Sequence, residues 1–296
     1  MRTISRAKSL NGNTTAVETG RPKRVLALAL ATALLRWPAG NFWRLRKLVT
    51  LAACIAFWEL ASRSILPALN PRFAALMPPP SSVLIAGAEL VINGVLFKHL
   101  LASLKRTLVA SLLAGAIAVP LGIAMGWWPA VYEQLDPVIE LLRPVPPLSW
   151  IPLSILWFGI GDTQNQFIIF LGAFFPILVN TIAGVRAVEP NLIRAARCLG
   201  AEGWTLLYRV VFKAALPYIV TGIRIGLGVG WMCLVAAELV GAASGLGFLI
   251  NDARNFLRTD IILVGMATIG VMGLTMDRVL RLVIRRAMPW YRGAVR

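Results

Sequence analysis

The chain has 296 residues, of which 58% are apolar and 15% are charged, and its mean hydropathy is +0.73. Soluble domains are about half apolar and a quarter charged, so the composition predicts a polytopic, all-helical membrane protein. Thirty Lys and Arg against 13 Asp and Glu give a net charge of +17. In a soluble protein that excess would indicate nucleic-acid binding, but here it first predicts orientation in the bilayer, and we expect no nucleic-acid partner. Three cysteines and one histidine are too few for a metal or disulfide framework.

Six stretches are apolar enough to cross a bilayer, which needs about 20 mostly apolar residues per helix. In chain order they are residues 48–66, 107–132, 139–160, 163–185, 214–240 and 261–284. The apolar stretch 25–35 is too short to span and is flanked by basic residues, so it is either an interfacial segment or the apolar part of a cleaved signal peptide. We favour the interfacial segment, because Arg36-Trp37-Pro38 follows it rather than a small-residue cleavage site.

The positive charges predict the orientation of the spans. With the N-terminus inside, 21 of the 30 Lys and Arg residues lie on the inner side, seven lie outside, and Arg143 and Arg224 fall within spans. Both termini are therefore expected to be cytoplasmic. The predicted organisation is a basic cytoplasmic N-terminal segment (1–47), the first transmembrane helix (48–66), a core (67–285) with a cytoplasmic loop (186–213), and a basic cytoplasmic tail (286–296).

The external connection 70–104 is too long for a simple turn. It opens with three prolines and two serines (78–82) and continues with apolar periodicity, which predicts a helix capped at its own start and lying on the outer face. Near the other end of the chain, Glu238 is expected to orient the segment 242–256.

The internal segment 191–217 combines small residues, a glycine and a proline. Ala195 and Ala196 are small enough to let a short helix approach a groove on a soluble partner. Gly200 is expected to turn the chain, and Pro217 to end the segment before the fifth span.

This segment resembles the cytoplasmic coupling loop of ATP-binding-cassette importer permeases. The family pattern is Glu-Ala-Ala, three residues, Gly, nine residues, an apolar residue and Leu-Pro. Here Arg194 replaces the acid, and Phe212-Lys213 stands where Leu-Pro is usual, with Leu216-Pro217 four residues later. By this resemblance the ATPase-coupling residues are Arg194, Ala195, Ala196, Gly200, Ala201, Glu202 and Trp204.

Further stretches are similar to the nitrate, taurine, sulfonate and bicarbonate permease subfamily, and the resemblance covers about residues 80–290. They are residues 142–152, with Arg-Pro-Val-Pro-Pro and Trp-Ile-Pro, and residues 156–161, 172–176, 237–238 and 244–247. The resemblance implies a type I (MetI-like) importer permease in the bacterial inner membrane, working as a homodimer. It also implies two cassette ATPase subunits and a periplasmic or lipid-anchored solute-binding protein. ATP and Mg²⁺ would bind the ATPase subunits, since this chain has no Gly-x4-Gly-Lys-Ser/Thr loop.

Two features within the spans could form the substrate path. Four prolines between 144 and 152 must interrupt the third span. Irregular backbone at membrane depth is tolerated where it lines a cavity, and the alternative is a structural kink buried in protein. Arg224 lies deep in the fifth span, where three roles are open: it attracts an anion, it forms a structural pair (with Glu140 as one candidate), or its side chain snorkels towards the inner surface. The substrate-path candidates are Arg143, Pro146, Ser149, Trp150 and Arg224, and the helix-packing candidates are Gly222, Gly226 and Gly230.

The expected function is the transmembrane subunit of an ATP-driven importer for a small oxoanion of the nitrate, taurine, sulfonate or bicarbonate class, and not an enzyme. The nearest alternative is a secondary carrier driven by an ion gradient without an ATPase. A membrane-embedded enzyme is a more distant one, because the spans hold no cluster of acids, His or Cys.

Overall fold

The computed structural model describes residues 39–69 and 76–288, and these residues contain helices and no strand. The chain divides into two compact units, residues 1–57 and 58–296. The first unit contributes most of α2. The segments in chain order are α2 (Ala39–Leu60), the π-helical η1 (Ala61–Ile65), α3 (Leu66–Leu69), α5 (Pro80–Ile92), α6 (Val95–Trp127), α7 (Pro129–Leu142), the 3-10 turn η2 (Pro147–Trp150), α8 (Ile151–Phe158), α9 (Asp162–Arg186), α10 (Pro190–Cys198), α11 (Gly203–Leu206), the π-helical η3 (Leu207–Val211), α12 (Phe212–Gly241), α13 (Leu246–Asn255) and α14 (Thr259–Ala287).

Within the described residues, five helices are long and apolar enough to cross a membrane, which confirms the all-helical membrane class. They are Val49–Ala68, Val95–Trp127, Asp162–Arg186, Gly203–Gly241 and Thr259–Arg286. The predicted span 139–160 is not one helix but α7, a turn, η2 and α8. The interruption falls on the predicted prolines, each of which removes a backbone donor.

The predicted start of the second span, at residue 107, is wrong. α6 already begins at Val95, so Lys105 and Arg106 lie within the helix rather than in an external connection. The helix can continue through Arg106 because its guanidinium donates to the carboxylates of Asp162 and Glu238. α6 stops at Trp127, since Trp128 adopts an extended conformation (φ −105°, ψ 111°) ahead of Pro129, which starts α7.

Pro217 does not end the polar segment as predicted. The chain is helical without interruption from Gly203 to Gly241, through α11, η3 and α12, and Pro217 lies inside α12. A proline already has the φ angle of a helix, and it removes only the bond to the Lys213 carbonyl. A neighbouring π-helical turn and surrounding helices make this tolerable at membrane depth.

The predicted cap of α5 comes from elsewhere in the chain. No side chain of its own caps the helix; instead, the Ser81 backbone N–H donates to Glu59 Oε2 at 3.1 Å. The Ser81 hydroxyl also donates to Glu59 Oε1 at 2.9 Å. A carboxylate at a helix N-terminus accepts an otherwise unpaired amide and suits the positive end of the helix dipole, so Glu59 stabilises the start of α5.

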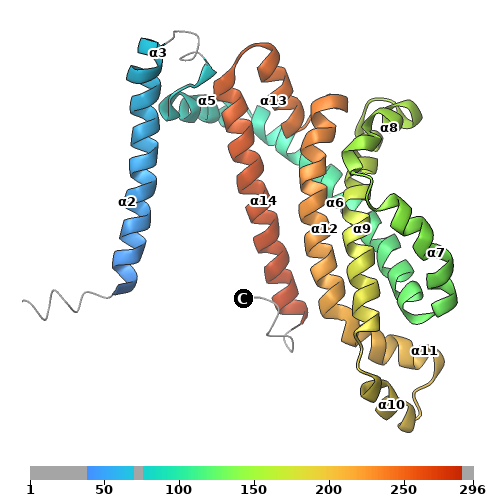
Figure 1. Cartoon of the computed structure of the whole chain (residues 1–296). Coiled ribbons are helices and arrows are strands. Elements are labelled where there is room, and N and C mark those ends of the chain that lie inside the picture. The colour runs from blue at the N-terminus through green and yellow to red at the C-terminus, as the bar shows by residue number, and fades with distance from the viewer. Residues whose placement is uncertain (1–38, 70–75, 289–296) are drawn as a thin grey trace, which may run out of the picture. The chain divides into compact units, whose positions relative to one another are not determined.

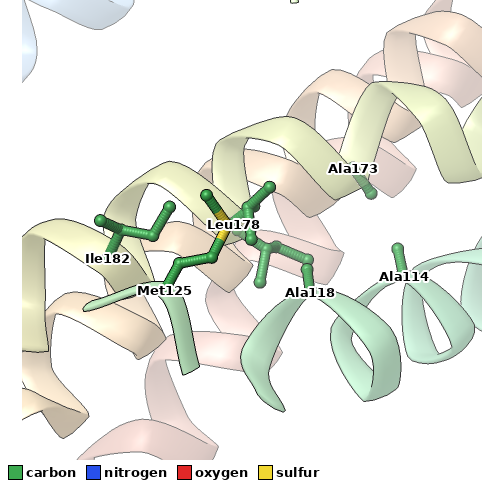
Figure 2. Close-up of a cluster of buried hydrophobic side chains, with 7 residues drawn as sticks. Ala114, Ala118, Met125, Ala173, Leu178 and Ile182 are labelled. Atoms are coloured by element: carbon green, nitrogen blue, oxygen red, sulfur yellow. The ribbon is translucent and has the colours of Figure 1, made fainter. Parts of the chain in front are cut away.

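The centre of the second unit is α9, which packs between α6 and α12 (Figure 1). Figure 2 shows the contact with α6, where Ala114 and Ala118 lie opposite Ala173 and Leu178 of α9. Small residues on both helices let the backbones approach closely. On the other side of α9, a methyl group added to Gly226 would lie only 2.8 Å from the Ala173 carbonyl oxygen.

Candidate functional site

The α10–α11 segment lies at one end of α9 and α12, and α8 and α13 lie at the opposite end (Figure 1). Gly200 ends α10 with φ +83°, a left-handed conformation that favours glycine. The Ala201 N–H donates to the Ala196 carbonyl at 3.0 Å, and the Gly200 N–H to the Arg197 carbonyl at 2.9 Å. These two bonds close the helix in a Schellman motif, which gives Gly200 its physical role as a turn.

This segment carries large apolar side chains on its surface. Leu199 is 89% exposed and Trp204 is 77% exposed, whereas Ile193 of α10 packs against the buried cluster that includes Val185 and Val188. Exposed apolar groups on an otherwise polar helix pair are typical of a protein-binding surface. The predicted coupling residues all lie here: Arg194, Ala195, Gly200, Glu202 and Trp204 are exposed, whereas Ala196 and Ala201 are half-buried.

The break between α7 and η2 borders two cavities. The first has a volume of about 360 Å³ and is lined by Arg143, by Asn180 of α9 and by apolar residues of α9 and α12. The second, of about 610 Å³, is lined by Arg143 together with Asp136, Glu140 and Arg186. The structure therefore places Arg143 between the two cavities.

The other substrate-path candidates lie elsewhere. Pro146 and Ser149 are exposed and line neither of these cavities, and half-buried Trp150 packs beside Ile151 and Trp157. Arg224 lines a different cavity of about 470 Å³ between α12 and α14. The structure does not bring Arg143 and Arg224 into one described cavity.

Arg224 forms an ion pair, but Glu140 is not its partner. Its Nε donates to Asp277 Oδ1 of α14 at 2.7 Å, and Asp277 Oδ2 also pairs with Arg281 Nη1 at 2.7 Å. The alternative with Glu140 is wrong because α14 runs beside this part of α12, whereas α7 lies beyond α9 (Figure 1). Arg224 is thus a structural cation in this conformation.

The packing glycines lie along the face of α12 that meets α9. An added methyl group would lie 2.8 Å from Asn180 Cβ at Gly222, and 3.2 Å from Ile169 Cγ2 at Gly230. Gly228, on another face, has nothing within 4 Å of such a group.

A buried polar network joins α6, α9, α12 and α13. Arg106 Nη1 donates to Glu238 Oε1 at 2.7 Å, and Arg106 Nε donates to Asp162 Oδ1 at 2.7 Å. The Ser103 hydroxyl donates to Glu238 Oε1 at 2.8 Å. The Gly247 N–H donates to Glu238 Oε2 at 2.9 Å, which confirms that Glu238 orients the segment after α12.

The sequence interpretation missed the α6 side of this network. Ser103 lies in the predicted external connection 70–104, and Arg106 is counted among the outer cations, although His99, Ser103 and Arg106 recur at helical spacing in an otherwise apolar stretch. The Gly245 N–H donates to His99 Nδ1 at 3.0 Å, and the Leu246 N–H to Ser103 Oγ at 2.8 Å. Polar residues at this spacing in an apolar stretch predict a helix with one polar face, and that pattern indicates the network from the sequence.

Comparison with known proteins places these features in a family context. Residues 118–289 match the family described as binding-protein-dependent transport system inner membrane component. The chain is 43% identical over 261 residues to the taurine transport system permease protein TauC of Escherichia coli, covering 86% of this chain and 93% of TauC. It is 36% identical over 246 residues to the putative aliphatic sulfonates transport permease protein SsuC of Bacillus subtilis, with coverages of 83% and 87%.

A third relative is the nitrate import permease protein NrtB of Synechocystis, which is 30% identical over 254 residues, with coverages of 83% and 90%. Among solved structures, the methionine ABC transporter MetNI in an inward-facing conformation has a similar fold, with a TM-score of 0.50 at 22% identity. The match covers 64% of this chain and 96% of that chain.

Proposed function

The chain belongs to the family of binding-protein-dependent transport system inner membrane components, and from this premise we propose that it imports a small oxoanion of the nitrate, taurine, sulfonate or bicarbonate class. The observation that carries the proposal is the set of relatives, named for taurine, aliphatic sulfonates and nitrate, that are 30–43% identical over most of their length. Taurine, sulfonates and nitrate share a compact group of three oxygens around one nitrogen or sulfur atom, and bicarbonate has three oxygens around carbon. Family membership favours an ATP-driven importer subunit over an ion-gradient carrier or an enzyme.

The partners follow from the same premise. We propose two cassette ATPase subunits, which bind ATP and Mg²⁺, a solute-binding protein outside, and a second copy of this chain in the inner membrane. The loop 186–213 and both termini would then be cytoplasmic, in agreement with the bias of Lys and Arg. Exposed Leu199 and Trp204 on the α10–α11 segment support an ATPase-docking role for this loop.

The continuous helix Gly203–Gly241 suits the transmission of force. Its α12 part has 30 residues and extends over about 45 Å at 1.5 Å per residue, from the end near the α10–α11 segment to the opposite end of the bundle (Figure 1). Because α12 packs closely on α9 through glycines, a push on Trp204 would move α9 and α12 together. Such movement of paired helices is a means of alternating access to a central path.

The test is uptake by the reconstituted complex of the chain, its ATPase and its binding protein. We expect uptake of labelled taurine, sulfonate or nitrate that requires ATP. Ala195→Asp and Gly200→Asp place a charge on the docking surface and should abolish co-purification of the ATPase. Asn255→Asp, exposed on α13 at the opposite end, is the matched control and should leave co-purification intact. Normal assembly and transport with both loop variants would show that the coupling assignment is wrong.

A further inference from the structure

We propose that Arg143 and Asn180 bind the anionic head group of the substrate in the 360 Å³ cavity beside the α7–η2 break, and that the apolar wall of this cavity favours sulfonates with an organic chain over nitrate or bicarbonate. This inference rests on the proposed function and deepens it, because it names the side chains that contact the oxoanion and the subclass of oxoanion.

Charge pairing distinguishes Arg143 from Arg106 and Arg224. Arg106 is held by Glu238, and Arg224 by Asp277, so the charge of each is already compensated. Arg143 lies within 4.0 Å of no carboxylate in the described ranges 39–69 and 76–288. Arg143 is exposed at the border of both cavities, so its unpaired guanidinium is accessible to an anionic ligand.

The backbone explains why Arg143 remains free. Its N–H completes α7 by donating to the Ile139 carbonyl at 2.8 Å, and the next residue, Pro144, cannot continue the helix. The Val145 N–H then closes a turn on the Leu142 carbonyl at 3.1 Å. Arg143 therefore lies at the end of α7, at the break before η2, and its side chain is exposed.

Asn180 provides a second polar group on the same cavity. One amide N–H donates to the Pro176 carbonyl at 2.8 Å, which fixes the side chain along α9. The other N–H has no acceptor within the part of the chain that the structure describes. A sulfonate has three acceptor oxygens, so two can bind the guanidinium in bidentate fashion while the third accepts from the amide.

The remaining wall of the cavity is apolar. Phe175 and Val179 line it from α9, and Ile225 and Val229 line it from α12. Nitrate and bicarbonate have no alkyl group to place against these side chains. A methylene removed from water increases affinity by about fourfold, so a two-carbon or longer tail gains substantially from this wall.

The test is direct binding to the complex of this chain with its ATPase in lipid nanodiscs, without the binding protein, which would otherwise select the substrate first. Labelled taurine is displaced by unlabelled ethanesulfonate, butanesulfonate and nitrate. We expect butanesulfonate to compete about tenfold better than ethanesulfonate, and nitrate to compete least. Phe175→Ala should reduce the difference between the two sulfonates.

The variants separate Arg143 from general charge effects. Arg143→Gln should weaken taurine binding at least tenfold, and Arg143→Lys less, because lysine keeps the charge but loses the bidentate geometry. Arg286→Gln removes an exposed cation in the last turn of α14 and should change binding less than threefold. If Arg143→Gln does not assemble with the ATPase, Asn180→Ala replaces it, with an expected loss of three- to tenfold.

Two results would overturn the inference: unchanged taurine binding by the assembled Arg143→Gln complex (or by Asn180→Ala in its place), or equal competition by nitrate and butanesulfonate. Neither would affect the proposed function, which depends on ATP-driven oxoanion uptake by the wild-type complex. Failure of that uptake with every oxoanion would instead refute the proposed function.

Discussion

Breaking the buried Arg106–Glu238 pair should destabilise the protein severely, whereas removing both charges should not. The Arg106 side chain is 4% exposed and that of Glu238 is fully buried. Removing one partner of such a pair costs about 3–5 kcal/mol, because the other charge stays buried. For Glu238→Met we expect about 3 kcal/mol, since Asp162 still accepts from Arg106 Nε at 2.7 Å.

A double-mutant cycle measures this coupling. Thermal unfolding of the detergent-solubilised chain, followed by tryptophan fluorescence at one scan rate, should show Tm about 6–12 °C lower for Glu238→Met, on the scale of 2–4 °C per kcal/mol. Arg106→Met should cost at least as much. The double variant Arg106→Met/Glu238→Met should be more stable than either single variant.

The Arg224–Asp277 pair is the matched control, because its side chains are 40% and 32% exposed. Arg224→Met should cost less than about 1 kcal/mol. Additive losses in the Arg106/Glu238 cycle, or equal losses from the buried and the exposed pair, would refute the reasoning.

Two further predictions concern glycines. Gly226→Ala should lower the free energy of unfolding by about 1–3 kcal/mol, because its methyl group would lie 2.8 Å from the Ala173 carbonyl oxygen. Gly228→Ala, whose methyl group would have nothing within 4 Å, should be neutral or stabilise the protein by up to about 1 kcal/mol. Thermal unfolding of the two variants checks this, and equal Tm values would contradict the close packing of α9 and α12. Gly200→Ala should cost about 1 kcal/mol locally, since φ is +83°, and should weaken ATPase binding in a titration more than it lowers Tm. A loss of Tm without any loss of ATPase affinity would argue against the coupling role.

The sequence by itself determined those features that depend on neighbours along the chain. Long apolar runs predicted the helical membrane class, because a bilayer requires about 20 apolar residues per helix. Closely spaced prolines predicted the interruption between α7 and α8, since each removes a backbone donor whatever the tertiary context. Gly200 was predicted as a turn for an equally local reason, and its left-handed φ agrees.

Only the tertiary structure decided which charges are paired. Arg106 and Glu238 lie 132 residues apart in the chain, and Arg224 and Asp277 lie 53 apart, so no spacing rule connects them. Hydropathy predicted the start of α6 at residue 107, twelve residues after its actual start at Val95. A buried, charge-paired arginine lowers the local hydropathy as much as an arginine in a loop does. Whether a cation is structural or free to meet an anion depends on which helices pack beside it, and that distinguishes Arg143 from Arg224.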